Sequence, residues 1–349
     1  MIPQAKNRKT LTLRAAAQIS THPKGTTMKT SARRPAHATA TLAALLASAW
    51  MAAPAGAATI NVACPGQTIQ NALASAQPGD TIMVSGTCAE NVLVRNEKLR
   101  FTIDGGNVAV INAPGNTSAA LTIRGKGIVV QNFANITGGS RGIEVQRGSS
   151  AVINNNTIQA TGGDGVYIHE LAFAALTFNL IQNNPRNGVQ VSYGGTANIG
   201  FNFVDDAAAS ANIIDGNTLR GVNVSEGAMA WIAGNTIANN GSDGIGVLRN
   251  GRASVASNAI NGNGGNGVNV SENASVDLGE DSPVTFFQQP NTTTINNSGY
   301  GIQCTLGAVV KGHLGSSNKL NGTLAQFGNG TGNTFGSGCL TATSDLVTP

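Results

Sequence analysis

Residues 156–170 read NTIQATGGDGVYIHE, and residues 235–249 read NTIANNGSDGIGVLR. In both stretches a glycine begins a short segment with apolar residues at alternate positions. The same glycine recurs along the chain at Gly142, Gly165, Gly188, Gly221, Gly244, Gly267 and Gly301. The successive spacings are 23, 23, 33, 23, 23 and 34 residues. Two copies of a 23-residue unit therefore carry insertions, which we place near residues 197–208 and 279–290.

Two other residue types keep this register when they are counted backwards from the glycines. Asparagine lies nine residues before five of the glycines, isoleucine lies seven before, and a second asparagine lies four before. The columns are Asn156, Asn179, Asn212, Asn235 and Asn258; Ile158, Ile181, Ile214, Ile237 and Ile260; and Asn184, Asn217, Asn240, Asn263 and Asn297. Asparagine columns at turns can satisfy backbone groups at each step of a stack. The second insertion interrupts the first two columns, where Thr292 and Thr294 take their places.

A unit of this size with three short strand patterns cannot bury its apolar side chains alone. When copies stack, each strand pairs in parallel with the copies above and below it, and like side chains form ladders. The expected apolar columns are Val166, Val189, Val222, Ile245 and Val268, and Ile168, Val191, Val224, Val247 and Val270. Leucine-rich and helical repeats fit poorly, because the leucines of the first and the 3.6-residue period of the second are absent. The pattern therefore predicts an all-β fold, a parallel β-helix solenoid.

The first 57 residues are predicted to be a leader rather than part of the fold. Met28 is the expected true start, followed by basic residues within 29–34 and a short apolar segment at Thr41–Ala53. The small residues 55–57 then supply a cleavage site. The apolar segment is too short to span a bilayer, so we expect no membrane association after cleavage. The sequence thus predicts a secreted or periplasmic protein.

The leader also carries much of the positive charge. Eight of the 21 lysines and arginines lie before residue 58, as do none of the 17 acidic residues, which leaves 13 basic against 17 acidic and a formal charge of −4. A nucleic-acid partner therefore loses its compositional support. The 45 glycines and 4% aromatic residues favour short strands with tight turns over a large globular core. We expect a monomer.

All four cysteines lie beyond the leader, at Cys64, Cys88, Cys304 and Cys339. An even number in an exported chain indicates disulfides, and we pair the cysteines locally as the first two and the last two. Their spacing matches no zinc-site template, so no metal site is predicted.

One stretch near the start has a helical pattern. Thr68–Ala76 reads TIQNALASA, a turn follows at 77–80, and a strand pattern begins at Thr81. Because a stacked sheet has open edges, we interpret the helix as an N-terminal cap over the first coil. The expected organisation is a cap with the first coils at 58–100 and repeats at 101–345.

With these residues the chain resembles the pectate-lyase-like superfamily of right-handed β-helices, and within it the exported bacterial branch of NosD-type and carbohydrate-associated repeat proteins. Residues 68–92, TIQNALASAQPGDTIMVSGTCAENV, and the units quoted above carry the resemblance, which covers about residues 58–340. The resemblance implies a right-handed parallel β-helix. It implies no particular activity, because this fold hosts lyases, hydrolases, epimerases, adhesins and rods. The clustered aspartates that would bind calcium in a pectate lyase are absent, so no cofactor is predicted and calcium has no support.

A polar column lies five residues after each of the first six glycines, with basic and acidic residues on neighbouring coils. The simpler interpretation is a solvent-facing ion ladder whose pairs contribute about 0–1 kcal/mol each. The alternative is a polar strip that hydrogen-bonds a glycan. Asp164 and Asp243 lie three coils apart, roughly 14 Å, whereas a glycosidase carboxylate pair needs about 5–9.5 Å. Asp164 and Asp243 are therefore excluded as a glycosidase pair. The members of the polar column are Arg147, Glu170, Tyr193, Glu226, Arg249 and Glu272.

The densest group of chemically active residues lies on the first two coils of the repeat. Glu144 and Tyr167 share an outward column, and pitch and rise place His169 about 8 Å from Glu144. A histidine beside carboxylates can act as acid or base in polyuronate elimination, and an arginine can bind a uronate carboxylate. A surface pair of His169 with a glutamate is the simpler alternative. The catalytic candidates are Glu144, His169 and Glu170, and the substrate-binding candidates are Arg147, Tyr167, Arg186, Tyr193, Glu226 and Arg249.

Two functions of different classes remain open. The first is an exported β-helix protein that binds an extracellular polysaccharide along an outward strand face and that, if it is an enzyme, cleaves it as a lyase or glycoside hydrolase. The second is a non-catalytic structural or adhesive rod at the surface or in the periplasm, which the low charge and the missing pair of acids favour.

Overall fold

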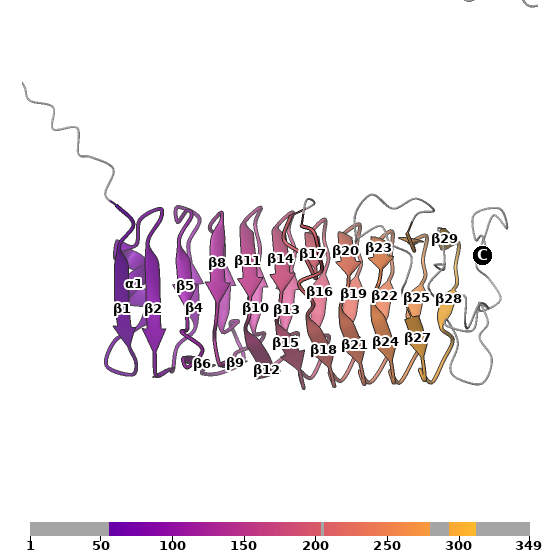
Figure 1. Cartoon of the computed structure of the whole chain (residues 1–349), viewed down its shortest axis with the longest axis horizontal. Coiled ribbons are helices and arrows are strands. Elements are labelled where there is room, and N and C mark those ends of the chain that lie inside the picture. Colours follow the sequence, from indigo (N-terminus) through magenta and orange to yellow (C-terminus); the bar gives the residue numbers. More distant parts are fainter. Residues whose placement is uncertain (1–55, 204–205, 280–292, 312–349) are drawn as a thin grey trace, which may run out of the picture. The chain divides into compact units, whose positions relative to one another are not determined.

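The chain winds in coils of three short strands, and equivalent strands of successive coils pair in parallel (Figure 1). This computed structural model describes residues 56–203, 206–279 and 293–311. The strands form three parallel sheets, which the chain visits in the order sheet 1, sheet 2, sheet 3. The predicted parallel β-helix is confirmed, with about nine turns.

The bounds of the strands follow from this order. Sheet 1 contains β1 (Thr59–Ala63), β2 (Thr81–Ser85), β5 (Thr102–Asp104), β8 (Ile128–Gln131), β11 (Ser150–Asn154), β14 (Phe173–Thr177), β17 (Thr196–Ile199), β20 (Met229–Ala233), β23 (Arg252–Ala256), β26 (Ser275–Asp277) and β29 (Val309–Lys311). Sheet 2 contains β3 (Thr87–Cys88), β6 (Val110–Ala113), β9 (Asn135–Gly138), β12 (Thr157–Thr161), β15 (Leu180–Gln182), β18 (Ile213–Asp215), β21 (Thr236–Ala238), β24 (Ala259–Asn261) and β27 (Thr293–Ile295). Sheet 3 contains β4 (Val92–Val94), β7 (Leu121–Ile123), β10 (Ile143–Val145), β13 (Val166–Ile168), β16 (Val189–Val191), β19 (Val222–Val224), β22 (Ile245–Val247), β25 (Val268–Val270) and β28 (Ile302–Cys304).

The core lies between the three sheets and consists of stacked columns. In sheet 3, Val189 pairs with Val166 below it and Val222 above it, and the same register continues along the sheet. All ten residues of the two apolar columns predicted from the sequence are fully buried, as are the five isoleucines of the repeated column in sheet 2, Ile158, Ile181, Ile214, Ile237 and Ile260. Each such side chain contributes about 1.5–3 kcal/mol through burial. Both predicted columns are confirmed.

Two buried asparagine ladders connect the sheets at the corners of the coils. Asn212 is representative: its Oδ1 accepts hydrogen bonds from the backbone N–H and the Nδ2 of Asn179, both at 2.9 Å. Its own Nδ2 donates to Leu176 O at 2.8 Å and to Asn235 Oδ1 at 2.9 Å. Both asparagine columns seen in the sequence form such ladders, and none of their members is more than 2% exposed. They hold each corner to the corners above and below.

Helix α1 (Ile69–Ser75) lies within the stretch predicted to be helical. Thr68 caps its first turn by accepting a hydrogen bond from the backbone N–H of Asn71. The Glu90 carboxylate accepts hydrogen bonds from the first two backbone N–H groups of the helix, at 2.7 and 3.0 Å. The buried side chains of Ile69 and Leu73 join the core, and α1 contacts β1, β2 and β4.

The disulfide predicted between Cys64 and Cys88 is confirmed. Cys304 is buried in β28, where it stacks on Val270, but its predicted partner Cys339 lies outside the described residues. Residues 280–290 of the second insertion also lie outside them, as does the leader except for residues 56 and 57. Among the described helices, none is long and apolar enough to cross a membrane.

The first insertion leaves the solenoid between β17 and β18 and returns over sheet 1. Phe201 is 1% exposed and is buried against Ala233 and Ala256, with Trp231 beside them. Asn198 Nδ2 donates to Asn202 O at 3.1 Å, and the Asp206 carboxylate accepts from the backbone N–H of Asn202 at 2.8 Å. A second, small apolar cluster thus lies outside the main core.

Candidate functional site

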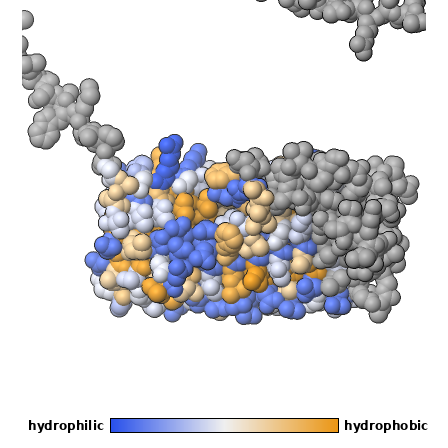
Figure 2. All heavy atoms as spheres, in the orientation of Figure 1, coloured by the Kyte–Doolittle hydropathy of each residue, from blue (hydrophilic) through white to orange (hydrophobic). Residues whose placement is uncertain are grey.

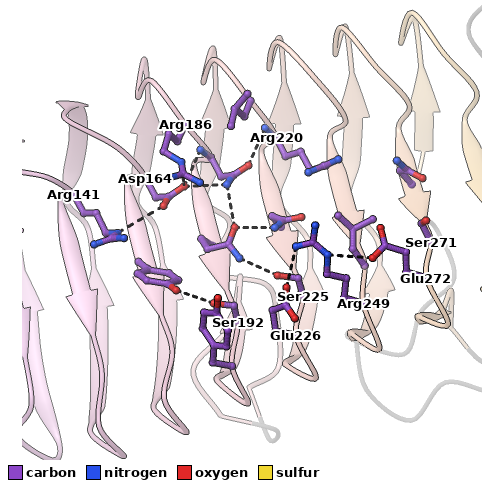
Figure 3. Close-up of a pocket in the computed structure, with 18 residues that line it drawn as sticks. Arg141, Asp164, Arg186, Ser192, Arg220, Ser225, Glu226, Arg249, Ser271 and Glu272 are labelled. Atoms are coloured by element: carbon purple, nitrogen blue, oxygen red, sulfur yellow. Dashed lines mark hydrogen bonds and ion pairs between the residues drawn. The ribbon is translucent and has the colours of Figure 1, made fainter.

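A groove of about 470 Å³ crosses the outer face of sheet 3 (Figure 3). Each strand there has three residues, and the middle one points outward because its neighbours fill the core. The outward side chains that form the floor are Tyr167, Gln190, Asn223 and Asn269. On the face shown in Figure 2, hydrophilic and hydrophobic residues are interspersed rather than gathered into one apolar patch. All four floor residues of the groove carry hydrogen-bonding groups, so the groove is suited to a ligand that makes many hydrogen bonds.

Hydrogen bonds between coils hold the floor in place. Gln190 Oε1 accepts from Asn187 Nδ2 at 3.0 Å and from Asn223 Nδ2 at 2.8 Å, and Gln190 Nε2 donates to Ser225 Oγ at 3.2 Å. One edge of the groove carries Arg141, Arg186 and Arg220, as Figure 3 shows. The hydrogen bonds preorganise the amides of the floor, and the three arginines place positive charge along one edge of the groove.

Four members of the alternating column predicted from the sequence, Tyr193, Glu226, Arg249 and Glu272, form the opposite edge. Arg249 lies between two glutamates, 2.9 Å from Glu226 and 3.1 Å from Glu272. The hydrogen bond to Glu226 and the nearby carboxylate charges raise the pKa of Arg249. Arg147 pairs more loosely with Glu170, at 3.8 Å. All six members of the column have positive φ, so the ladder marks the turns that follow β10, β13, β16, β19, β22 and β25.

Two of the three catalytic candidates, Glu144 and His169, are in direct contact beside Tyr167, which lines the groove, but none of the three candidates lines the groove itself. His169 Nε2 is 3.2 Å from Glu144 Oε1, closer than the 8 Å expected from pitch and rise, because the two side chains lean toward each other. His169 Nδ1 lies 3.8 Å from Glu170 Oε1. The His169 ring stacks on Tyr167 with centroids 4.2 Å apart. The histidine side chain is only 10% exposed, so it does not face solvent as the sequence pattern suggested.

Arg141 completes this cluster and was not among the predicted site residues. Its guanidinium lies 4.6 Å from the centre of the Tyr167 ring and 3.3 Å from Glu144 Oε1. Its position directly before Gly142, in one column with Asp164, was the signal that could have found it. Of the predicted binding residues, Tyr167, Arg186, Tyr193, Glu226 and Arg249 line the groove and Arg147 does not.

The environment shifts two pKa values in this cluster. Burial raises the pKa of Tyr167, although the hydrogen bond from Ser192 acts in the opposite direction, and the phenol is therefore held in its neutral form. Burial also opposes ionisation of Glu144, but the hydrogen bond to His169 and the charge of Arg141 outweigh it and lower the pKa of Glu144. The cluster is thus built to hold Glu144 as a carboxylate.

The lowered pKa of Glu144 predicts a pH-dependent contribution to stability. A carboxyl group whose pKa is lower in the folded state stabilises the protein above its unfolded pKa and loses that contribution as the pH falls through the folded value. We expect Glu144→Gln to be destabilising at pH 7, and the difference from wild type to shrink as the pH falls below the ordinary value of 4.5. Urea unfolding of both proteins at pH 7, 5 and 3 checks this. A difference that does not change with pH would contradict it.

One grouping of potential metal ligands occurs in the described part of the chain, formed by Cys64, Cys88 and Glu90. Both sulfur atoms are joined in the disulfide, so this grouping offers no thiolate to an ion.

Comparisons with known proteins agree with this architecture. No curated protein matches the chain. Among solved structures it is similar to an alginate lyase from Paenibacillus sp. str. FPU-7, with 16% identity, a TM-score of 0.54, and coverage of 73% of this chain and 93% of that one. It is also similar to the A-module of the mannuronan C-5 epimerase AlgE6 from Azotobacter vinelandii, with 14% identity, a TM-score of 0.42, and coverage of 74% and 79%. A third similar structure is the pectate lyase Pel9A, with 14% identity, a TM-score of 0.39, and coverage of 84% and 83%.

At 16% identity and a TM-score of 0.54, the alginate lyase structure supports the fold alone. The family model described as "Right handed beta helix region" matches residues 55–204 and 203–340, which is most of the sequence. The chain therefore belongs to the right handed beta helix region family.

Proposed function

We propose that this chain binds an extended polysaccharide in the groove on sheet 3. The observation that carries the proposal is a groove that crosses successive coils, about 4.8 Å apart, and is lined by amide, hydroxyl and charged groups. An extended polymer can contact several of these coils at once. The similar fold of an enzyme that acts on alginate supports the same class of ligand.

Binding is better supported than cleavage by the chemistry of the groove. The Glu144–His169 pair is largely buried, and the exposed acids of the groove, Glu226 and Glu272, are engaged by Arg249. A proton acceptor for elimination has to reach the substrate within about 2.6–3.2 Å. Cleavage nevertheless has one observation in its favour, because Tyr167 lines the groove directly above His169.

A structural or adhesive rod is the alternative outside carbohydrate binding. It requires no ordered groove, whereas the hydrogen bonds of Gln190 with Asn187, Asn223 and Ser225 build one. We further propose that the protein is exported, which the Cys64–Cys88 disulfide supports, and that α1 shields the first coil as a cap.

Arg186 offers a test of the groove because its side chain is 59% exposed and pairs only loosely, at 3.9 Å, with Asp164. We expect Arg186→Gln to weaken binding of an acidic polysaccharide about tenfold, through loss of one charge-assisted contact. The measurement is calorimetric titration with polygalacturonate, alginate and a neutral glucan. Arg252→Gln removes the same charge from the outer face of sheet 1 and should bind as wild type does.

The same preparations separate the three functions. Appearance of unsaturated products, measured by ultraviolet absorbance with and without calcium, would identify a lyase, and its dependence on His169→Ala and Glu144→Gln would locate the chemistry. Failure of the wild-type protein to bind any of the glycans would contradict the proposal and favour the rod.

A further inference from the structure

The groove repeats its polar contacts every three coils. The residues directly before the strand glycines read arginine, aspartate, asparagine twice, and corresponding residues are 79 positions apart. We call Arg141, Asp164 and Asn187 the first triad and Arg220, Asp243 and Asn266 the second triad. In each triad the buried aspartate Oδ1 accepts the backbone N–H and the Nδ2 of the asparagine, at 3.0 and 2.9 Å in the first triad and at 2.9 Å for both in the second. The two triads are thus equivalent structures.

In the first triad the arginine is shared between two carboxylates. Arg141 Nη1 lies 3.3 Å from Glu144 Oε1, and Arg141 Nε lies 3.8 Å from Asp164 Oδ2. Glu144 is the outward residue of β10, three positions after the arginine. A carboxylate therefore already occupies the place in front of this guanidinium.

In the second triad the corresponding place is open. The residue equivalent to Glu144 is Asn223, and within the described part of the chain Asp243 is the single carboxylate within 4.0 Å of Arg220, at 2.9 Å from Nε. A guanidinium carries five N–H donors, and this contact uses one of them. The Asp243 carboxylate is in turn shared with other donors, because its Oδ2 also accepts a hydrogen bond from Asn269 Nδ2. Arg220 can therefore bind a second carboxylate, as Arg141 does.

A second observation points to a ligand at the same place. Asn223 is 8% exposed, and its Oδ1 has no hydrogen-bond partner among the described residues. The orientation of the amide is fixed, because Nδ2 donates to Gln190 Oε1 at 2.8 Å. An unpaired buried carbonyl costs about 1–3 kcal/mol, so such groups are normally satisfied.

Gly246 brings these two groups together. A Cβ atom at this position would lie 2.5 Å from Arg220 Cδ and Nε and 3.1 Å from Asn223 Oδ1. In the first triad the equivalent position is Tyr167, and Arg141 lies above its ring rather than on the sheet. The absence of a side chain at Gly246 therefore leaves room for Arg220 to contact Asp243, with Asn223 Oδ1 nearby.

We propose that the second triad is a carboxylate-binding site, in which a ligand carboxylate takes the place that Glu144 fills in the first triad. A hydroxyl next to that carboxylate donates to Asn223 Oδ1. The inference rests on the proposed function insofar as the ligand is an acidic sugar residue of a polysaccharide. A free hydroxy acid has the same two groups, so the ligand length has to be tested separately.

The test exchanges the residues that distinguish the triads. Asn223→Glu supplies the second triad with its own carboxylate and should weaken binding of oligogalacturonate about 10- to 100-fold, whereas the matched Asn223→Gln variant should stay within about threefold of wild type. The double variant Glu144→Asn, Tyr167→Gly gives the first triad the residues of the second and should add one galacturonate site per chain. Calorimetric titrations use monomeric galacturonate, oligogalacturonate, and the oligomer with its carboxylates reduced to alcohols. Far-UV circular dichroism confirms that each variant is folded.

The outcomes separate this site from the proposed function. Equal affinities of Asn223→Glu and Asn223→Gln for the acidic oligomer would overturn the site, as would equal binding of the acidic and reduced oligomers by wild type, and both results leave polysaccharide binding intact. A third outcome is that wild type binds the monomer, that Asn223→Glu abolishes this binding, and that no oligomer binds more tightly. This outcome would support the carboxylate-binding site and exclude a polysaccharide as its ligand.

Discussion

Replacement of Asn212 by alanine is expected to lower the free energy of unfolding by about 3–4 kcal/mol. Its side chain is fully buried and makes four hydrogen bonds within the ladder between sheets 1 and 2. The backbone N–H of Asn179 has Asn212 Oδ1 as its acceptor, so alanine leaves that buried donor without a partner. The remaining loss comes from three weakened contacts and from the space that the amide filled.

Asn154→Ala is the matched control. Asn154 lies on the outer face of β11, is partly exposed, and accepts one side-chain hydrogen bond, from Thr177 Oγ1 at 2.9 Å. Its loss should cost about 1 kcal/mol or less. Guanidinium unfolding followed by far-UV circular dichroism compares the two variants with wild type. Similar shifts of the two unfolding midpoints would show that the buried ladder contributes no more than a surface contact.

The architecture could be predicted from the sequence because the repeat determines which residues stack. Once the glycines set the period, Val189 has to lie over Val166 and Asn212 over Asn179, and both pairings are present. The first insertion did not disturb this prediction, because it changes the spacing between β17 and β18 and leaves the pairing of β15 with β18 in register. The Cys64–Cys88 disulfide followed from local pairing alone.

The candidate site was less predictable because it depends on how far side chains reach between coils. Alternation placed His169 outward, but the residue four after each glycine lies where the chain enters the left-handed turn, and Ser192 and Ser225 are buried there as well. The reach of Arg220 depends on the absence of a side chain at Gly246 in the next coil. Neither effect is visible in a single 23-residue unit.

Gly221→Ala is expected to destabilise the protein by about 3 kcal/mol, because a methyl group is forced into a closed space. The Cβ atom would overlap Ile237 Cγ2 and lie 2.7 Å from Gly244 O, both in the next coil. Ile237 is fully buried, and Gly244 O accepts the N–H of Val222 at 2.9 Å, so neither atom can move without loosening the stack.

Gly227→Ala in the same coil separates this cause from backbone conformation. Gly227 has a φ of +70° and no atom within 4 Å of the Cβ position, so alanine should cost only the left-handed strain of about 1–2 kcal/mol. The surroundings of Gly221 recur at Gly165, Gly188 and Gly244, where a Cβ atom would also meet an isoleucine and a carbonyl of the next coil. Glycine is therefore required at these positions because successive coils approach too closely for a Cβ atom. Chemical unfolding tests this directly, and a Gly221→Ala variant as stable as Gly227→Ala would require another reason for the glycine repeat.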